Sequence, residues 1–424
     1  MSSPKGNLSL PPPLRPTYFL VDLDLLAHNV RELRRITAPG TQLMTVIKAD
    51  GYGHGLLEAA PVCLANGAGW LGVATVDEAL ALRCAGFTAP VLVLGYSAPW
   101  QAAALARADI AVTVMTAETA IALSDAAAPG RRRARVHIKV DSGMSRLGIW
   151  PDDAGLELVE RIARLPGLEL EGIFTHFASA DEADKTFTHQ QFARYLEFVG
   201  QLAGRGIEFA LRHAANSAAL LDLPETHLDL VRPGVMIAGV WPSADVQRRI
   251  DLRPSQTLVT EIAYLKELAA GRKISYGGTY ETTGPTVLAT LPLGYHDGYK
   301  RGLSNKAEML VRGVRAPVRG RVCMDQSMID VSGIPGVAAG DSVVALGCWG
   351  AEAVTADELG VRLGSIGYEI VTTIGARVPR LYVQDGRPVK VRGPLGSWAV
   401  DSWQDLPWPG VEATYLATRP TTEG

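Results

Sequence analysis

The chain has 424 residues, and its 41 basic and 44 acidic residues give a formal net charge of −3. Hydrophobic residues make up 47% of it and charged residues 20%, a composition typical of a globular protein that buries a full core. This charge argues against nucleic acid or an anionic membrane as the main partner.

The N-terminus carries no sign of export. Residues 1–16 are polar, contain three consecutive prolines and lack the apolar core of a signal peptide, and no later segment is apolar for long enough to cross a bilayer. The cysteines are scattered without a CxxC pair, at Cys63, Cys84, Cys323 and Cys348. Neither a zinc site nor a disulfide framework is therefore expected. We expect a flexible arm over 1–16 and a reducing, cytoplasmic location.

Beyond a helical face over 22–36, strand-like apolar runs alternate with helical patterns. The runs span 42–48, 69–75, 90–96, 110–115, 135–141, 168–177, 209–214 and 228–237. The helical patterns span 56–66, 77–86, 98–107, 117–127, 152–164 and 187–204. This alternation predicts a (β/α)8 barrel over 17–250. A doubly wound sheet ranks second, because GYGHG (51–55) lacks the glycine spacing that would follow its first strand.

The pattern changes near Arg253 and Pro254. Short strand-like segments separated by turn signals now dominate, at 257–265, 286–293, 308–311, 317–323, 327–331, 341–347, 380–384 and 388–392. One helical insertion begins at Thr355, with Glu358 three residues later as in a capping box. We predict a mostly β domain over 251–395, followed by a tail over 396–424 that packs on the surface.

The first barrel strand ends in the stretch VIKADGYGHG (46–55), in which Lys48 interrupts a buried run. A partly desolvated lysine has a lowered pKa and can act as a nucleophile, as Schiff-base chemistry requires. The glycines that follow let the backbone approach a ligand closely. A lysine at a strand end is nevertheless more often a surface residue with a buried stem, so this stretch alone decides little.

Polar residues also end other barrel strands, at the face where barrel active sites lie. They are Lys139 with Arg146 just beyond, His176, Asn216-Ser217 and Arg232-Pro233-Gly234. An inward-facing lysine must find a partner or lose its charge, and an arginine can grip a carboxylate or phenolate. His176 fits a metal ligand, a base or a ring stacked on a planar cofactor, and Ser217 with the Gly234 and Val235 amides fits a phosphate. No two of these side chains have metal-ligand spacing, so no metal is expected.

Three segments of the β domain are rich in tyrosine or glycine. They are ISYGGTY (274–280), LGYHDGY (293–299) and GRVCMDQ (320–326). They indicate a lined pocket, although a tyrosine-rich β surface explains them equally well when they are taken alone.

Together these motifs resemble the alanine racemases, pyridoxal-phosphate enzymes built from a (β/α)8 barrel and a C-terminal β domain. The resemblance runs in order over 20–395, through VIKADGYGHG, HIKVDSGMSRLG, GIFTHFASAD, HAANSAA, VRPGV, SYGGTY, LGYHDGY and GRVCMDQ. It implies pyridoxal 5'-phosphate as cofactor and a homodimer with active sites shared between subunits. It also implies interconversion of L- and D-alanine, which supplies D-alanine for peptidoglycan.

The resemblance further assigns roles to single residues. Lys48 would hold the cofactor covalently and act as one of two bases, with Tyr276 of the partner subunit as the other. His176 would stack near the cofactor ring, and Arg232 would face the pyridine nitrogen. The cofactor phosphate would be bound by Tyr52, Ser217, Gly234 and Val235. Because an arginine cannot accept a proton, Arg232 would leave that nitrogen unprotonated and suppress transamination.

Substrate-binding roles follow in the same way. Arg146 would bind the ring phenolate and approach the substrate carboxylate. Lys139 is similar to a lysine that many members carbamylate, which would give Arg146 a fixed anion. Met324 and Asp325 would lie beside the substrate. The access corridor would consist of Asp181, Tyr295, Arg301 and Arg321.

The chain departs from the family pattern at Ala376, where many members have a tyrosine that reaches the phosphate. Cofactor affinity and strict preference for alanine are therefore open, and a broad-specificity or serine racemase of the same fold remains an alternative. A barrel-type decarboxylase is a weaker one, because such enzymes usually pair the pyridine nitrogen with an acid. A non-catalytic pyridoxal-phosphate-binding barrel is weaker still, because it would lack the β domain.

Overall fold

The computed structural model describes residues 15–127, 132–408 and 410–419, so nearly all of the predicted arm lies outside the described residues. The chain divides into two compact units. One consists of Leu26–Arg253, and the other combines the residues up to Leu25 with those from Pro254 onward. No helix in the described ranges is long and apolar enough to cross a membrane.

The first unit is built on eight strands in the order β8-β7-β6-β5-β4-β3-β2-β9, and all neighbouring pairs are parallel. They are β2 (Gln42–Val46), β3 (Trp70–Val73), β4 (Val91–Val93), β5 (Ala111–Val114), β6 (Ala134–Lys139), β7 (Leu168–Phe174), β8 (Leu211–His213) and β9 (Leu230–Val231). Backbone hydrogen bonds from Asp229 N to Arg212 O (3.0 Å) and from Arg232 N to Ala215 O (3.1 Å) join the two ends of this order. The sheet therefore closes, and the predicted barrel is confirmed.

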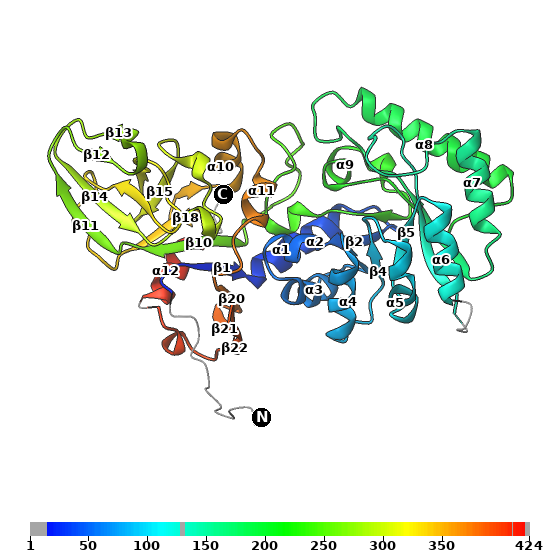
Figure 1. Ribbon diagram of the computed structural model, residues 1–424, viewed down its shortest axis with the longest axis horizontal. Helices are drawn as coiled ribbons and strands as arrows, with labels where there is room; N and C mark the ends of the chain where they lie inside the picture. The colour runs from blue at the N-terminus through cyan, green and yellow to red at the C-terminus, as the bar shows by residue number, and fades with distance from the viewer. Residues whose placement is uncertain (1–14, 128–131, 409, 420–424) are drawn as a thin grey trace. The chain divides into compact units, whose positions relative to one another are not determined.

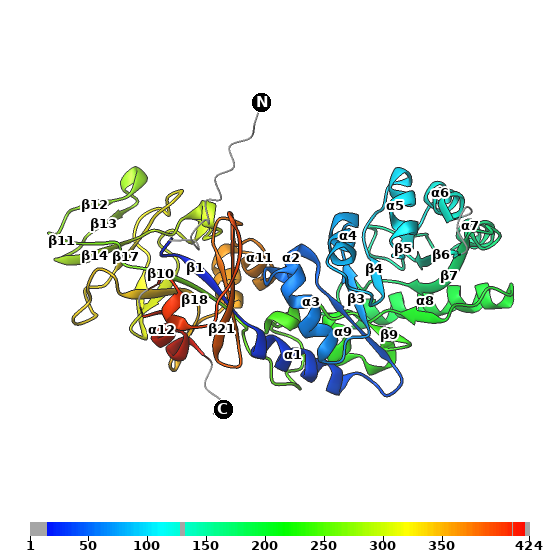
Figure 2. The same ribbon diagram turned by 90° about the horizontal axis from the view of Figure 1, so that it is seen from below.

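Helices follow the strands and surround them on the outside (Figures 1 and 2). They are α1 (Leu23–Ile36), α2 (Lys48–Tyr52), α3 (Leu56–Ala65), α4 (Val76–Cys84), α5 (Ala102–Arg107), α6 (Ala117–Ala127), α7 (Asp153–Ala163), α8 (Thr186–Gly204) and α9 (Ser217–Asp222). Side-chain caps fix where several of them begin. Asp152 accepts a hydrogen bond from Gly155 N at the start of α7, as an N-cap aspartate does.

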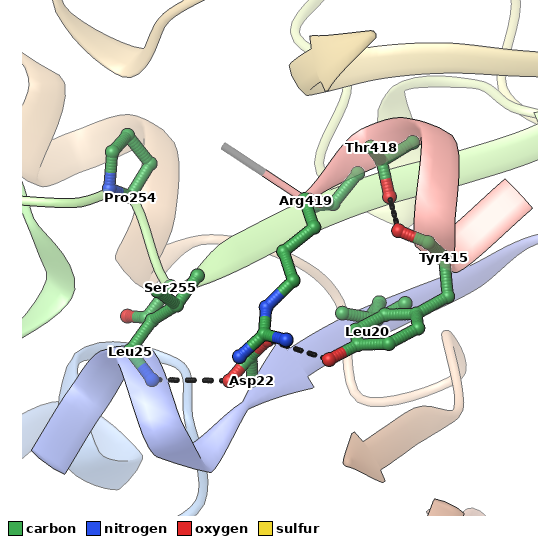
Figure 3. A pocket seen from close by; sticks show the side chains of 9 residues that line it. Leu20, Asp22, Leu25, Pro254, Ser255, Tyr415, Thr418 and Arg419 are labelled. Carbon is green, nitrogen blue, oxygen red and sulfur yellow. Dashed lines mark hydrogen bonds and ion pairs between the residues drawn. The ribbon is translucent and has the colours of Figure 1, made fainter. Parts of the chain in front are cut away.

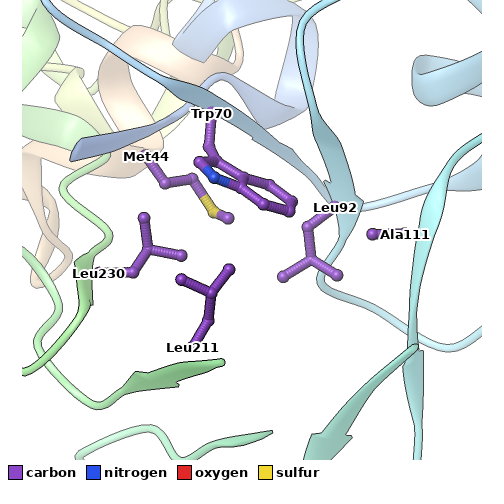
Figure 4. Close-up of a cluster of buried hydrophobic side chains, with 6 residues drawn as sticks. All are labelled: Met44, Trp70, Leu92, Ala111, Leu211 and Leu230. Carbon is purple, nitrogen blue, oxygen red and sulfur yellow. The ribbon is translucent and has the colours of Figure 1, made fainter. Parts of the chain in front are cut away.

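Apolar side chains from six strands meet inside the barrel (Figure 4). They are Met44, Trp70, Leu92, Ala111, Leu211 and Leu230. Four of them are the first residue of their strand, so this cluster fills the N-terminal end of the barrel. The C-terminal ends of the strands are thereby left to the polar side chains, on the face where barrel enzymes bind their substrates.

The second unit is mostly β. Its largest sheet has the order β16-β15-β18-β10-β1-β20-β21-β22, with β19 paired to β18. These strands are β1 (Tyr18–Asp22), β10 (Gln256–Glu261), β15 (Glu308–Val311), β16 (Val314–Pro317), β18 (Ser342–Trp349), β19 (Glu352–Val354), β20 (Arg380–Gln384), β21 (Arg387–Gly393) and β22 (Gly396–Ala399). Smaller sheets and helices are β11 (Tyr264–Leu268) with β14 (Thr286–Leu291) and β17 (Ser327–Asp330), β12 (Lys273–Ile274) with β13 (Tyr280–Glu281), α10 (Ala356–Leu363), α11 (Gly367–Thr372) and α12 (Val411–Thr418).

Strand β1 lies in this second unit, although the predicted barrel range began at residue 17. It pairs antiparallel with β10, where Leu20 faces Thr257, and parallel with β20, where Leu20 faces Leu381. All five of its residues are buried. A short apolar run of this kind indicates a buried strand but not the sheet that receives it.

The predicted surface tail is an integral part of the β unit. Strand β22 extends the large sheet, and α12 contributes Tyr415, which is 1% exposed. A small pocket at this place shows Tyr415 and Arg419 directed at the Asp22 carboxylate (Figure 3). Tyr415 Oη donates to Asp22 Oδ2 at 3.1 Å, and Arg419 Nε lies 3.6 Å from the same atom. The tail therefore holds the end of β1.

Candidate active site

Lys48 follows β2 directly and begins a left-handed turn. Ala49, Asp50, Gly51 and Tyr52 all have φ between 52° and 67°. Asp50 Oδ1 accepts a hydrogen bond from Leu56 N at 2.9 Å, which fixes the turn against the start of α3. Such conformations are costly for residues other than glycine and occur where surrounding structure enforces them, often at functional sites.

The pKa of Lys48 is lowered from its ordinary value. Burial is the largest cause and the Arg146 cation adds to it, while the Glu78 carboxylate acts in the opposite direction. A larger fraction of the amine is therefore neutral, and nucleophilic, at physiological pH than for an exposed lysine.

Three groups from different parts of the chain form a polar cradle near β9. Ser217 Oγ, at the start of α9, accepts a hydrogen bond from Gly234 N at 2.9 Å. A β-carbon built on Gly234 would lie 2.4 Å from Tyr52 Oη, so only glycine fits there. Val235 is the next residue and begins a 3-10 turn. Hydroxyl and backbone amide groups gathered in this way suit a phosphate.

Arg232 is buried and uses its guanidinium to bind three acceptors. It donates to His213 Nδ1 (2.9 Å), Thr175 O (2.8 Å) and Ala214 O (3.0 Å). Burial lowers the pKa of Arg232 to about 10. The side chain thus remains a cation at neutral pH, with a fixed orientation.

The chain of hydrogen bonds continues beyond Arg232 into the barrel. His213 Nε2 lies 2.8 Å from His137 Nδ1, and His137 Nε2 lies 3.2 Å from Glu171 Oε2. Burial lowers the pKa of both imidazoles, and the nearby Arg232 cation lowers them further. Since His213 must accept from Arg232 at Nδ1, it carries its proton on Nε2 and donates to His137.

Lys139 ends β6 and is 6% exposed. Its amine lies 3.4 Å from Val140 O and 4.8 Å from the centre of the Phe174 ring. Its pKa is held well below the ordinary value, chiefly by burial and then by the Arg232 and Arg146 cations. A neutral amine can form a negatively charged adduct, and the surrounding cations would stabilise that charge.

Arg146 lies in the loop after β6, and its side chain is exposed. Asp141 shapes the loop by accepting hydrogen bonds from Gly143 N and Ser145 N, both at 3.0 Å. His176 follows β7, is half-buried, and has a pKa well below its ordinary value through burial and then the Arg232 and Lys139 cations. It is therefore a neutral ring at physiological pH.

These barrel residues fit pyridoxal phosphate. A lysine with a lowered pKa, a cradle of hydroxyl and amide donors, a neutral imidazole ring and a fixed arginine match its aldehyde, phosphate, ring and pyridine nitrogen. No cluster of His, Cys, Asp or Glu that could hold a metal ion occurs in the described part of the chain.

Most of the other predicted residues lie in the β unit, around three neighbouring loops. Tyr276 follows β12 and is 70% exposed, and Met324 is 52% exposed. Ser275 Oγ donates to Arg321 O at 2.6 Å, and Tyr295 N donates to Cys323 O at 2.9 Å. The loops around 276, 295 and 321–325 are thus joined.

The two remaining corridor residues belong to different units. Arg301 begins the turn Arg301–Leu303, which contacts the loop around 321 through a hydrogen bond from Val322 N to Ser304 Oγ at 3.0 Å. Asp181 lies in the barrel unit before α8, and its backbone carbonyl accepts from Ser243 Oγ at 2.5 Å. Ala376, the departure from the family pattern, is exposed.

Sequence reasoning missed His213, His137 and Glu171, the three residues that continue the hydrogen bonds of Arg232 into the barrel. His137 could have been found, because it precedes Lys139 by two positions and strand alternation places both side chains on the same face. His213 stands in the HAANSAA motif at the end of β8 and offered the same signal as His176. Glu171 could not be found, since only the fold brings it to His137.

Comparison with known proteins agrees with this arrangement. The model of the alanine racemase N-terminal domain matches residues 21–242, and that of the alanine racemase C-terminal domain matches 255–382. An alanine racemase from Desulfosudis oleivorans is 48% identical over 371 residues, which cover 85% of this chain and 95% of that protein.

Solved structures give the same result. The structure of alanine racemase from Bacillus anthracis with bound L-Ala-P has a TM-score of 0.85 at 37% identity, covering 90% of this chain and 98% of that one. Alanine racemase from Streptomyces coelicolor A3(2) has a TM-score of 0.83 at 37% identity, with 87% and 98% covered. The chain therefore belongs to the alanine racemase family of isomerases.

Proposed function

We propose that the protein is a pyridoxal-phosphate-dependent racemase that interconverts L- and D-alanine and supplies D-alanine for peptidoglycan. The observation that carries this proposal is Lys48, with its lowered pKa, at the end of a barrel strand whose unit also holds the Tyr52–Ser217–Gly234 cradle and the fixed Arg232. We place the enzyme in the cytoplasm, in keeping with four free cysteines.

The barrel residues bind and orient the cofactor. Pyridoxal phosphate, when bound, delocalises the negative charge that develops on the substrate α-carbon as its proton leaves. Lys48 would hold the cofactor aldehyde, and Ser217, Tyr52 and the Gly234 amide would hold its phosphate. Arg232 would face the pyridine nitrogen as a donor that cannot accept a proton.

Two bases on opposite faces of the α-carbon carry out the proton transfers. The Lys48 amine removes or returns the proton on one face, and the Tyr276 hydroxyl does so on the other. Arg321 lies beside the tyrosine loop, where a β-carbon on Gly277 would be 3.4 Å from its Cζ.

Arg146 binds the substrate carboxylate and the cofactor phenolate, and Lys139 supports it. The Lys139 amine adds to carbon dioxide and releases a proton, which leaves a carbamate anion. Burial is the largest cause of the lowered pKa of Lys139, and the Arg232 and Arg146 cations lower it further. The same two cations would stabilise the negative charge of the carbamate.

We infer a homodimer in which each active site combines the barrel of one subunit with the β unit of the other. Tyr276 and Met324 are among the exposed large side chains of the β unit, so they are accessible to a second copy. Met324 and Asp325 then lie beside the substrate, and Asp181, Tyr295, Arg301 and Arg321 line the route to it.

Chiral analysis of alanine tests this function. Purified protein incubated with pyridoxal phosphate and L-alanine is expected to form D-alanine well ahead of D-serine or D-lysine from their L-isomers. Lys48→Ala is the control and should form none, because it removes both a base and the cofactor anchor. D-serine formed as fast as D-alanine would establish a broad-specificity racemase instead, a possibility raised by Ala376.

Cofactor capture by the apo-protein should depend on pH in a way that reports on Lys48. Only the neutral amine attacks an aldehyde, so below the Lys48 pKa the capture rate should rise about tenfold per pH unit. Because that pKa is lowered, the rise should end below pH 10.5, the ordinary lysine value. Stopped-flow absorbance at constant ionic strength measures it, and a rise that continues past pH 10.5 contradicts the assigned environment.

A further inference from the structure

The C-terminal segment 396–419 is an addition to the family framework. The C-terminal family model ends at residue 382, and relatives matched over 95–99% of their own length cover only 85–90% of this chain. The segment nevertheless contacts the part of the β unit that carries the proposed substrate residues. This connection runs through an uninterrupted series of hydrogen bonds.

The series starts at Trp408, which is 5% exposed. Its ring stacks on Tyr18 with the ring centres 4.6 Å apart, and its Nε1–H donates to the backbone carbonyl of Arg15 at 2.6 Å. The indole thereby fixes the backbone of Arg15, three residues before β1 begins.

The Arg15 guanidinium in turn binds residues in and beside the loop over 293–299. Its Nη2 donates to Asp297 Oδ2 at 2.6 Å and to Pro292 O at 2.9 Å, and its Nη1 pairs with Asp297 Oδ1. Asp297 is fully buried and also accepts from Gly294 N at 2.9 Å. Burial acts against the charge of this carboxylate, yet its pKa is lowered because Arg15 and Arg377 bond to it.

Arg377 completes the path to the substrate loop. Its Nε donates to Asp297 Oδ1 at 2.6 Å, and its Nη2 donates to Asp325 Oδ1 at 2.7 Å. The Asp325 side chain is 58% exposed, so this bond is what orients it. The loop around Tyr295 is also hydrogen-bonded to the loop that carries Met324 and Asp325, since His296 N donates to Met324 O at 3.0 Å.

We propose that Trp408, Arg15 and Arg377 are positioning residues, which hold Asp325 and the neighbouring Met324 in place for the substrate. The inference rests on the proposed function, in which these two residues lie beside the substrate. The added segment acts through Arg15 and Asp297 rather than by touching the substrate itself. Loss of the series therefore changes where the loop lies and leaves the cofactor groups of the barrel intact.

Trp408→Phe is the sharpest variant, because it keeps an aromatic ring against Tyr18 and removes the N–H donor together with part of the indole volume. Trp403→Phe is its matched control. Trp403 lies in the same segment and packs on Tyr415 with ring centres 5.2 Å apart, away from Arg15. Arg15→Gln breaks the next step, and Arg15→Lys restores the charge without the two-pronged geometry.

Hydrogen exchange of the full-length protein gives a readout that does not need activity. Amides in 293–298 and 322–326 should exchange about three- to tenfold faster in Trp408→Phe than in wild type, the factor that loss of one hydrogen bond gives. Trp403→Phe should match wild type in these peptides. Equal exchange in both variants overturns the inference whether or not the protein racemises alanine.

Kinetics then test positioning. Trp408→Phe should raise the KM for alanine about three- to tenfold with kcat little changed, and Arg15→Gln should raise it about ten- to a hundredfold. Arg15→Lys should recover part of that loss, and cofactor absorbance should be unaltered in all. Faster exchange with an unchanged KM would overturn the positioning role, as would a loss confined to kcat. If Trp408→Phe does not fold, Arg15→Gln and Arg15→Lys carry the same comparison.

Discussion

Mixing Lys48→Ala subunits with Tyr276→Ala subunits is expected to restore racemase activity that neither variant has alone. If each active site takes its lysine from one subunit and its tyrosine from the other, every mixed dimer contains one site with both residues intact. Random reassociation of equal amounts makes about half of the dimers mixed, so activity should reach about a quarter of wild type. The mixture must first be dissociated mildly and then allowed to reassociate.

The double variant Lys48→Ala/Tyr276→Ala provides the control. When the double variant is mixed with wild type, each mixed dimer has one substituted residue in each shared active site and should be inactive. Total activity should therefore fall below the value that dilution of the wild-type enzyme alone would give. If each site were built within one chain, the outcomes would be reversed. The single variants would then fail to complement, and the double variant would only dilute. Activity that matches this second pattern removes the shared site from the proposal.

The barrel could be predicted because its signals are local. Each strand is a short apolar run, each helix has its own period, several helices have a side-chain cap, and eight such repeats close in one way. Strand β1 could not be assigned, since its neighbours β10 and β20 lie far along the chain. The tail was seen only as a surface element, because the strand β22 and the buried Tyr415 are recognisable only once the sheet exists.

The polar residues at the strand ends of the barrel could be predicted to lie together for a topological reason. Parallel strands bring their C-terminal ends to one face, so polar residues at those ends become neighbours without any further knowledge. No such rule predicts which residues bind the Asp297 carboxylate. Its partners Arg15 and Arg377 stand 282 and 80 positions away, and only the tertiary structure joins them. The grouping of polar residues at strand ends can therefore be predicted from the sequence, whereas the contacts that orient loops cannot.

The buried Arg232 shows what the sequence left out even at a residue that it singled out. Its two terminal nitrogens are already committed to His213 and to two backbone carbonyls. The guanidinium is therefore fixed by the barrel before any ligand binds. Its effect on a bound ring comes from a permanent positive charge and not from proton exchange, because its pKa of about 10 keeps it protonated at neutral pH.

Arg232→Glu is consequently expected to raise the ratio of transamination to racemisation by at least about tenfold. A carboxylate facing the pyridine nitrogen keeps that nitrogen protonated, which allows the substrate proton to be returned to a cofactor carbon as well as to the α-carbon. A preference of about 1.4 kcal/mol between the two sites already gives a factor of ten. Pyruvate formation, measured against D-alanine in single-turnover reactions, gives the ratio directly.

Arg232→Lys separates the effect of a carboxylate at the nitrogen from the effect of losing the arginine contacts. It keeps an N–H donor and introduces no carboxylate at the nitrogen, so its ratio should stay near the wild-type value even if both rates fall. Both variants leave the His213 Nδ1, Thr175 O and Ala214 O acceptors with fewer donors. The unfolding free energy is expected to fall by about 1–3 kcal/mol in the lysine variant. It is expected to fall by about 3–5 kcal/mol in the glutamate variant, which donates nothing and buries a carboxylate beside carbonyl oxygens. Because the ratio is measured within each folded variant, this difference in stability does not affect the comparison. An equal ratio in the glutamate and lysine variants would show that the charge facing the nitrogen does not control the outcome of the reaction.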